Sequence, residues 1–191
     1  MKKMQRSGKS IVQKNGQLSR KMDSKDLLEY FFEDSAREYH VRELAKLTRQ
    51  SPTTVAKNLD MLKKKGLLQK RLERQHLLYK ADNTSIFKTK KTNYYVEKIV
   101  ASGLLDELIK KLNPSCIILF GSVRKGESVK ESDIDLFIES HADIKVDAKK
   151  YEKSLKHKIQ LFVEKDMNKL QPQLFNNVVN GIKLYGSFKI R

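Results

Sequence analysis

Between residues 23 and 66 the apolar residues recur every three to four positions, which is the spacing of the buried face of a helix. The pattern predicts three short helices that begin near Ser24, Arg42 and Ser51. Their expected buried positions are Leu27, Leu28, Phe31 and Phe32 in the first, Leu44, Ala45 and Leu47 in the second, and Val55, Leu59 and Leu62 in the third. Ser24 and Ser51 suit N-caps, Pro52 suits the first position of the third helix, and Gly66 suits its end.

After Gly66 the pattern predicts a β-hairpin. Two runs, 67–72 and 76–80, flank a polar turn at Glu73-Arg74-Gln75 and place basic residues at the tip. A short extended piece precedes the second helix at 39–41, and Arg49-Gln50 forms a tight turn before the third. Two short helices joined by a tight turn and followed by a hairpin are typical of a winged helix-turn-helix. The segment 39–79 resembles the DNA-binding domains of many prokaryotic transcription regulators.

That resemblance implies which residues would touch duplex DNA. In this family the third helix lies in the major groove, and the hairpin, called the wing, contacts the backbone. By position, the groove-facing candidates are Gln50, Ser51, Thr53, Thr54, Lys57 and Asn58, and the wing candidates are Arg71, Arg74 and Gln75. Hydroxyl and lysine side chains near a helix N-terminus can bind phosphates, and Gln and Asn can read adenine edges. A winged helix used for protein contact or dimerisation remains an alternative.

In the second half of the chain, one stretch carries candidate chemistry. The run Cys116–Phe120 is apolar and rich in β-formers, which predicts a buried strand. Gly121 and Ser122 follow at once. Gly lets the backbone turn tightly and approach a ligand, and Ser adds a hydroxyl beside exposed backbone N–H groups, so the pair is a candidate phosphate seat. Asp133 and Asp135 then begin a second apolar run, and because side chains alternate along a strand, both carboxylates are expected on one side.

Two carboxylates on one side of a strand repel each other unless a cation or a donor lies between them. Mg²⁺ takes oxygen ligands, often one or two carboxylates plus phosphate oxygens, so an acid pair facing a phosphate seat favours metal-assisted nucleotidyl transfer. The signature of Gly-Ser, ten residues and Asp-x-Asp, with a strand on each side, resembles that of the minimal polymerase-β-like nucleotidyltransferases over about 112–191. The alternative without catalysis is a βαβ unit whose two Asp residues only cap a loop.

The resemblance implies a role for each residue of the signature. Asp133 and Asp135 would hold Mg²⁺ and act in catalysis, and Gly121 with Ser122 would position the β- and γ-phosphates of an NTP such as ATP. Arg124 and Lys125 follow closely and would bind triphosphate oxygens, unless they are solvated loop charges.

The chain departs from the family at the third carboxylate. The family usually supplies it from the strand after the Asp-x-Asp strand, where this sequence has Gln160 in the expected strand 158–163. Gln is neutral, so it cannot offset the charge of Mg²⁺ or accept the proton of an attacking hydroxyl. Glu164 could substitute only if the strand curls. A one-metal site, or a site that binds nucleotide without turnover, therefore stays open.

The remaining pattern completes an expected α+β chain in which a winged helix-turn-helix precedes a small mixed-sheet nucleotidyltransferase domain. We expect a basic disordered tail at 1–22, the winged helix at 23–82, a linker and connecting helix at 83–112, and the transferase domain at 113–191. Residues 81–92 read as a polar linker, and 94–112 as a helix broken near Ser102-Gly103. A loop at 141–147, a helix at 148–157, a helical stretch at 167–179 interrupted by Pro172, and an extended end at 182–190 complete the pattern.

Composition indicates a polyanion partner and excludes a membrane-spanning protein and an internally disulfide-bonded one. The net charge is +17, and residues 1–100 hold 24 Lys and Arg against 11 Asp and Glu, hence +13, which points to nucleic acid. A lysine-rich soluble surface is the alternative. No apolar stretch is long enough to span a membrane, and the single cysteine, Cys116, cannot form an internal disulfide, so we expect a cytoplasmic protein. His40 and His76 have no metal partner at useful spacing.

Three functions remain in competition. The first is a DNA-binding enzyme that transfers an NMP from an NTP to an acceptor hydroxyl; minimal transferases with this motif include antitoxins that adenylylate a partner toxin, so the acceptor could be a protein. The second is a winged-helix transcription regulator whose transferase domain is degenerate and serves as a nucleotide sensor or dimerisation module. The third uses the basic half to bind RNA. A homodimer stays open, although no heptad seam demands one.

Overall fold

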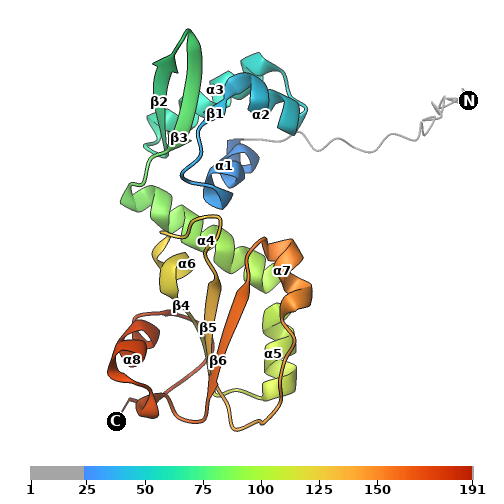
Figure 1. The fold of residues 1–191 in the computed structure, drawn as a ribbon, viewed down its shortest axis with the longest axis vertical. Helices are drawn as coiled ribbons and strands as arrows, with labels where there is room; N and C mark the ends of the chain where they lie inside the picture. Colours follow the sequence, from blue (N-terminus) through green and yellow to red (C-terminus); the bar gives the residue numbers. More distant parts are fainter. Residues whose placement is uncertain (1–23, 191) are drawn as a thin grey trace, which may run out of the picture.

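The computed structural model describes residues 24–190, with side chains from residue 27 onward. The expected tail at 1–22 and the expected cap at Ser24 lie outside what it describes. The chain forms a group of helices with a three-stranded sheet, then a four-stranded sheet flanked by helices, and the long helix α4 (Ser85–Ala101) runs between the two groups (Figure 1). This is a mixed α+β arrangement, as the sequence predicts.

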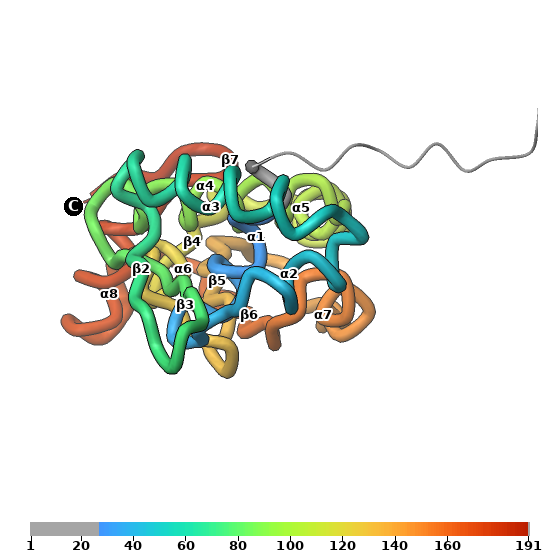
Figure 2. Tube along the Cα trace, turned by 90° about the horizontal axis from the view of Figure 1, so that it is seen from above, coloured from blue at the N-terminus to red at the C-terminus, as the bar shows by residue number. Residues whose placement is uncertain are grey.

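Residues 24–81, the N-terminal module, contain three helices and three strands. They are α1 (Ser24–Glu33), β1 (Tyr39–His40), α2 (Val41–Thr48), α3 (Pro52–Lys64), β2 (Leu68–Glu73) and β3 (His76–Ala81). The strands are antiparallel in the order β1-β3-β2. Apolar side chains from all three helices meet those of β3 in one core, in which Phe31, Leu44, Leu59 and Tyr79 are fully buried. Figure 2 shows this module from above, with the hairpin β2–β3 projecting beside α2.

Most helix signals in this module are confirmed. Ser51 is the N-cap of α3, its hydroxyl accepts from the Thr54 N–H at 3.1 Å, and Pro52 is the first helical residue. The expectation that Leu47 points inward is wrong, because its side chain is 50% exposed. The buried face of α2 instead uses Thr48, whose hydroxyl donates to the Leu44 carbonyl at 2.7 Å and therefore loses no hydrogen bond on burial. That the module is a winged helix-turn-helix stays a prediction.

The cap of α3 gives a direct stability test. Ser51→Ala should lower the free energy of unfolding by about 1 kcal/mol, because the Thr54 N–H loses its side-chain acceptor. Urea unfolding followed by circular dichroism measures the change. Thr53→Ala, at an exposed position of the same first turn, is the control, and an equal loss in both variants would contradict the cap.

The expected polar linker at 81–92 is wrong. Helix α4 begins at Ser85, capped by Thr84, whose hydroxyl accepts from the Phe87 N–H at 3.3 Å. The segment lacks an apolar stripe, but it buries Phe87 together with Lys91 and Thr92, whose polar atoms are hydrogen-bonded. A buried helix face made largely of polar residues cannot be predicted from the spacing of apolar residues. The expected break near Ser102-Gly103 is confirmed, since α5 (Leu104–Leu112) follows Gly103, which adopts φ +79°.

The second sheet has the order β6-β5-β4-β7 and positions the candidate site. It comprises β4 (Cys116–Phe120), β5 (Ile134–Glu139), β6 (Ile159–Glu164) and β7 (Ile182–Gly186). β5 pairs antiparallel with β4 and parallel with β6. One face packs Ile117, Leu119 and the even-numbered residues of β5 against α4, α5 and α7 (Lys149–Leu155). The other face packs Ile118, Phe120 and Phe137 against the 3₁₀ turn Met167–Lys169 and α8 (Pro172–Val179).

The later elements fall close to their expected positions. The helix expected at 148–157 is α7, the helical stretch interrupted by Pro172 is the 3₁₀ turn followed by α8, and the final extended segment begins with β7. Among the helices that residues 24–190 form, none has the length and apolar content to cross a bilayer.

Candidate active site

The Gly-Ser pair opens a short helix. The sequence predicts a tight Gly-Ser turn after the strand at 116–120, but Gly121–Lys125 is the helix α6, which starts directly after Phe120. Gly121 adopts φ +74°, a conformation that side-chain-bearing residues rarely adopt, and this lets the chain turn from strand to helix within one residue. Five residues are too few to show helical periodicity, so the sequence pattern could not reveal this helix.

Asp135, the second residue of the acid pair, lies against this turn. Phe120 pairs with Asp135 across β4 and β5, and a Cβ built on Gly121 would fall 2.0 Å from Asp135 Oδ2. The Asp135 carboxylate therefore occupies the space that a side chain at position 121 would take. Asp133 directly precedes β5, and Ile134 between the two acids is fully buried on the opposite face. The alternation expected from the sequence thus separates both acids from the buried Ile134, and Asp135 lies at the Gly-Ser turn.

The electrostatics agree with this proximity. Burial, followed by the nearby charge of Asp133, raises the pKa of Asp135 above its ordinary value. Both effects disfavour the ionised form, and a cation or a hydrogen-bond donor between the carboxylates would relieve them.

Gln160 completes the cluster. It lies opposite Asp135 in the parallel register of β5 and β6, and its Nε2 donates to Asp133 Oδ2 at 2.5 Å. The position expected for a third acid is thus beside both carboxylates. Glu164 cannot replace it, because it pairs with Glu139 at the other end of β5 and β6 stays regular between them.

The residues present fit Mg²⁺ as a two-carboxylate site. Within residues 24–190 no group of three or more His, Cys, Asp or Glu side chains is placed to hold a metal. Mg²⁺ is commonly bound through one or two carboxylates, with water and phosphate oxygens as the remaining ligands, so Asp133 and Asp135 meet that requirement. Burial and the neighbouring Asp133 raise the pKa of Asp135, and a bound cation would oppose both effects.

The neighbouring candidates fall on α6. Ser122 is half-buried in its first turn, and Arg124 and Lys125 form its last turn. Thr92 of α4 donates to the carbonyl of Arg124 at 3.0 Å, which fixes the end of α6. The structure therefore places Arg124 and Lys125 next to the turn along the chain, and binding of phosphate by their side chains stays a prediction.

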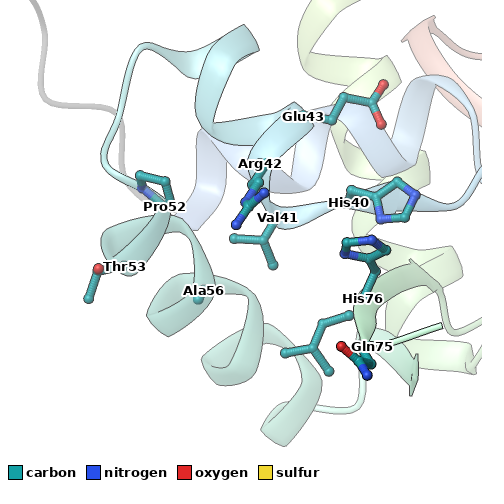
Figure 3. Close-up of a pocket in the computed structure, with 10 residues that line it drawn as sticks. His40, Val41, Arg42, Glu43, Pro52, Thr53, Ala56, Gln75 and His76 are labelled. Atoms are coloured by element: carbon teal, nitrogen blue, oxygen red, sulfur yellow. The ribbon is translucent and has the colours of Figure 1, made fainter. Parts of the chain in front are cut away.

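Two of the DNA-contact candidates line a cleft of about 820 Å³ in the N-terminal module (Figure 3). Thr53 and Gln75, from α3 and the hairpin turn, both line it. Among the other candidates, Ser51, Thr54 and Lys57 are exposed on α3, and Arg74 is exposed in the hairpin turn. Gln50 and Asn58 are half-buried.

Arg71 differs from the other wing candidates. Its guanidinium donates to both carboxylate oxygens of Glu38, at 2.9 and 2.5 Å, and to Glu73 at 3.1 Å. These two carboxylates offset its charge, so a phosphate would have to compete with them. Arg71 is therefore the weakest of the candidates for a backbone contact.

Three further residues of the cleft were not among the DNA-contact candidates. Arg42 lines the same cleft, and so do His40 and His76, whose rings meet edge to face with centroids 5.7 Å apart (Figure 3). His40 and His76 are brought together by the pairing of β1 with β3. The signal that could have found them is the strand pairing, which a linear pattern does not contain.

Comparison with known proteins finds a similar family for the second half of the chain. No curated protein matches the sequence. One protein-family model matches part of the chain. The match begins at Ala101, ahead of the expected domain start at 113, and therefore includes α5 together with the whole second sheet. Residues 101–188 match the model of the nucleotidyltransferase domain family, so this part of the chain is similar to enzymes that transfer a nucleoside monophosphate from an NTP.

Proposed function

We propose that the protein is a DNA-binding, Mg²⁺-dependent nucleotidyltransferase that moves an NMP from an NTP, ATP being the first candidate, to an acceptor hydroxyl. One observation carries the proposal: the Asp135 carboxylate lies in the space beside Gly121, within the segment that is similar to nucleotidyltransferases. An acid pair with one carboxylate beside a possible phosphate seat is the arrangement that this chemistry needs.

Each residue has a task in this proposal. Asp133 and Asp135 hold Mg²⁺, which when bound polarises the phosphate and offsets its charge. Gly121 leaves room for the acid beside the turn, and Ser122, Arg124 and Lys125 orient the triphosphate. The acceptor oxygen bonds to the α-phosphorus, the bond to the β-phosphate oxygen breaks, and pyrophosphate leaves. Because Gln160 cannot accept a proton, the proton of the hydroxyl passes to solvent.

The direct test is transfer of label. The full chain is incubated with Mg²⁺, each of the four α-labelled NTPs in turn, and protein, DNA or RNA acceptors, and labelled products are separated by size. We expect a labelled acceptor, with a partner protein as the first candidate. The double variant Asp133→Asn/Asp135→Asn serves as the blank, and equal labelling by the two proteins would refute the enzyme.

The N-terminal module would hold the enzyme on DNA. The support is the charge of residues 24–81, where 13 Lys and Arg stand against 8 Asp and Glu, hence +5, within the +13 of residues 1–100. The exposed Lys57 and hydroxyl side chains of α3 add to it. Duplex DNA should bind more tightly than RNA, with an affinity that falls steeply between 50 and 200 mM salt, as phosphate contacts require. Tighter binding of RNA would favour an RNA acceptor, and binding of neither would leave the cleft for protein contact.

Gln160 supports a second candidate function. If the missing third carboxylate abolishes turnover, the domain is a nucleotide sensor or dimerisation module of a transcription regulator. Wild-type protein would then bind an NTP in calorimetry and yield no labelled product.

Gln160→Asp separates the two functions. The substitution removes the amide donor to Asp133 and adds a third negative charge, so we expect lower stability without metal and a larger increase in the unfolding midpoint when Mg²⁺ is added. A sensor should gain transfer activity from this change. Gln173→Asp, at an exposed position of α8, is the control, and an equal Mg²⁺ response in both variants would contradict the metal assignment.

A further inference from the structure

Helix α4 belongs to both halves of the molecule. Phe87, near its start, is fully buried in the core of the N-terminal module and contacts Phe32 with ring centroids 5.3 Å apart. Tyr95 and Ile99, about two and three turns after Phe87, are fully buried against the second sheet. Tyr94 packs against both cores. Helix α4, which runs between the two groups of elements in Figure 1, is therefore packed into both cores.

The same helix holds the segment that leads to the candidate metal acids. We call residues 126–133, between α6 and β5, the acid loop, because it ends at Asp133. At its start, Gly126 lies so close to α4 that a Cβ there would fall 2.3 Å from the Lys88 carbonyl oxygen. The Lys88 ammonium also pairs with Glu127 at 2.6 Å.

Lys91 connects the acid loop to the N-terminal module. Its side chain is 1% exposed, and its Nζ donates to the Ser128 carbonyl in the loop and, at 3.3 Å, to the Ser35 hydroxyl in the segment between α1 and β1. Burial lowers the pKa of Lys91 to about 8, and the charge of Asp34 opposes this effect. A buried ammonium without a directly bonded carboxylate is costly, whereas an apolar side chain would pack there without that penalty. The hydrogen bonds to Ser128 and Ser35 are therefore what a lysine provides at this position and an apolar residue would not.

A second connection reaches the other end of the loop. His157 is 6% exposed, and its Nδ1 lies 2.5 Å from the carbonyl oxygen of Ser132, the residue before Asp133. Because a carbonyl can only accept, Nδ1–H donates, and Nε2 meets the Tyr95 hydroxyl at 2.7 Å. That hydroxyl also lies 3.4 Å from the carbonyl of Phe32 in α1.

The loop contains a buried polar group without a partner. Ser128 is 1% exposed, and within the part of the chain that the structure describes its hydroxyl has no hydrogen-bond partner. A buried hydroxyl without a partner costs free energy, which another loop arrangement could recover. This cost lowers the free energy needed to rearrange the loop when its connections to α4 change.

We propose that Lys91 and the Tyr95–His157 pair are positioning residues that fix the acid loop and couple the candidate active site to the N-terminal module. This rests on the proposed function, since it assumes that Asp133 serves metal and nucleotide. A ligand on the N-terminal module, duplex DNA in our proposal, shifts α1 and the segment after it, and the two connections carry the shift to Asp133. By thermodynamic reciprocity, nucleotide at the acid pair must then affect the N-terminal module.

Reciprocity allows a test that needs no DNA. Hydrogen exchange of the full chain is measured with and without Mg²⁺ and a non-hydrolysable ATP analogue, and the affinity for that analogue is measured by calorimetry. In wild-type protein the analogue should slow amide exchange both in residues 126–133 and in residues 34–38, which surround Ser35. Lys91→Met should weaken analogue binding about fivefold or more and remove the effect at 34–38, while the effect at 126–133 persists in part.

Two further variants keep the test decisive. Lys90→Met changes the same charge at an exposed position of the same helix and should behave as wild type. Tyr95→Phe removes one hydroxyl without loss of packing, so it decides the question if Lys91→Met fails to fold, and it should also weaken the response at 34–38.

The outcomes distinguish the coupling from the function. If wild-type protein binds the analogue and exchange at 34–38 is unchanged, or if Lys91→Met and Tyr95→Phe both respond as wild type, the coupling is refuted and the proposed function stands. If wild-type protein does not bind the analogue, the proposed function fails and the coupling falls with it.

Discussion

Replacing Asp135 by asparagine should lower Mg²⁺-dependent transfer of the nucleotide label by about three orders of magnitude. The metal supplies several kcal/mol of transition-state stabilisation, and about 1.4 kcal/mol corresponds to a tenfold change in rate. An amide keeps the shape of the carboxylate but carries no charge to hold Mg²⁺. The measurement is the initial rate of labelling at saturating NTP over a series of Mg²⁺ concentrations.

The same variant should not lose stability, and this separates a catalytic role from a structural one. The pKa of Asp135 is raised in the folded state, so its ionised form is disfavoured there and stability falls as pH rises through that pKa. At neutral pH the neutral asparagine removes this cost, and the unfolding midpoint should be equal to or higher than that of wild type. Asp143→Asn, at an exposed loop position, is the control for both measurements. A large loss of stability in Asp135→Asn would show that the carboxylate serves the fold.

Gly121→Ala should abolish transfer through the position of one carboxylate. The new methyl group would fall 2.0 Å from Asp135 Oδ2, so the acid must rotate away from the turn where we place the nucleotide. Because a carboxylate is the mobile end of its side chain, this rotation costs little stability. The main stability cost is an alanine in a left-handed conformation at φ +74°, about 1–2 kcal/mol.

Gly103→Ala is a matched control for that variant. Gly103 has φ +79°, almost the same backbone conformation, but a Cβ there would meet nothing within 4 Å. Both variants should therefore lose a similar free energy of unfolding in urea, while Gly121→Ala alone loses transfer activity and analogue binding. Equal activity in the two variants would contradict the close approach of Asp135 as the reason for glycine at position 121.

The elements that the sequence predicted well are those with a regular pattern or a strong end signal. The cap Ser51-Pro52, the break at Gly103 and the alternation around Ile134 each follow from local chemistry, and the structure confirms all three. The failures share a different cause. The start of α4 buries Lys91 and Thr92 through hydrogen bonds to loop and helix carbonyls, and these partners lie more than 30 residues away in the chain.

The sequence motif of the candidate site could be predicted, but the spatial arrangement of its residues could not. The spacing of Gly121, Asp133 and Asp135 indicated the acids and the turn, and the register of β5 with β6 was needed to place Gln160 beside them. The roles of these residues and of the DNA-contact candidates stay predictions. Lys91 and His157 carried no sequence signal at all, because a lysine on a polar helix and a single histidine are ordinary until burial is known.

The sharing of α4 also limits how this chain can be divided. The expected boundary between residues 82 and 83 would separate Phe87 from the core that it completes, and the first fragment would expose the apolar surface of Phe32 to water. A graft of the N-terminal module onto another protein would have to bring α4 with it, including the face that belongs to the second sheet. Recombination between genes would therefore tend to pass on the two halves as one inherited unit.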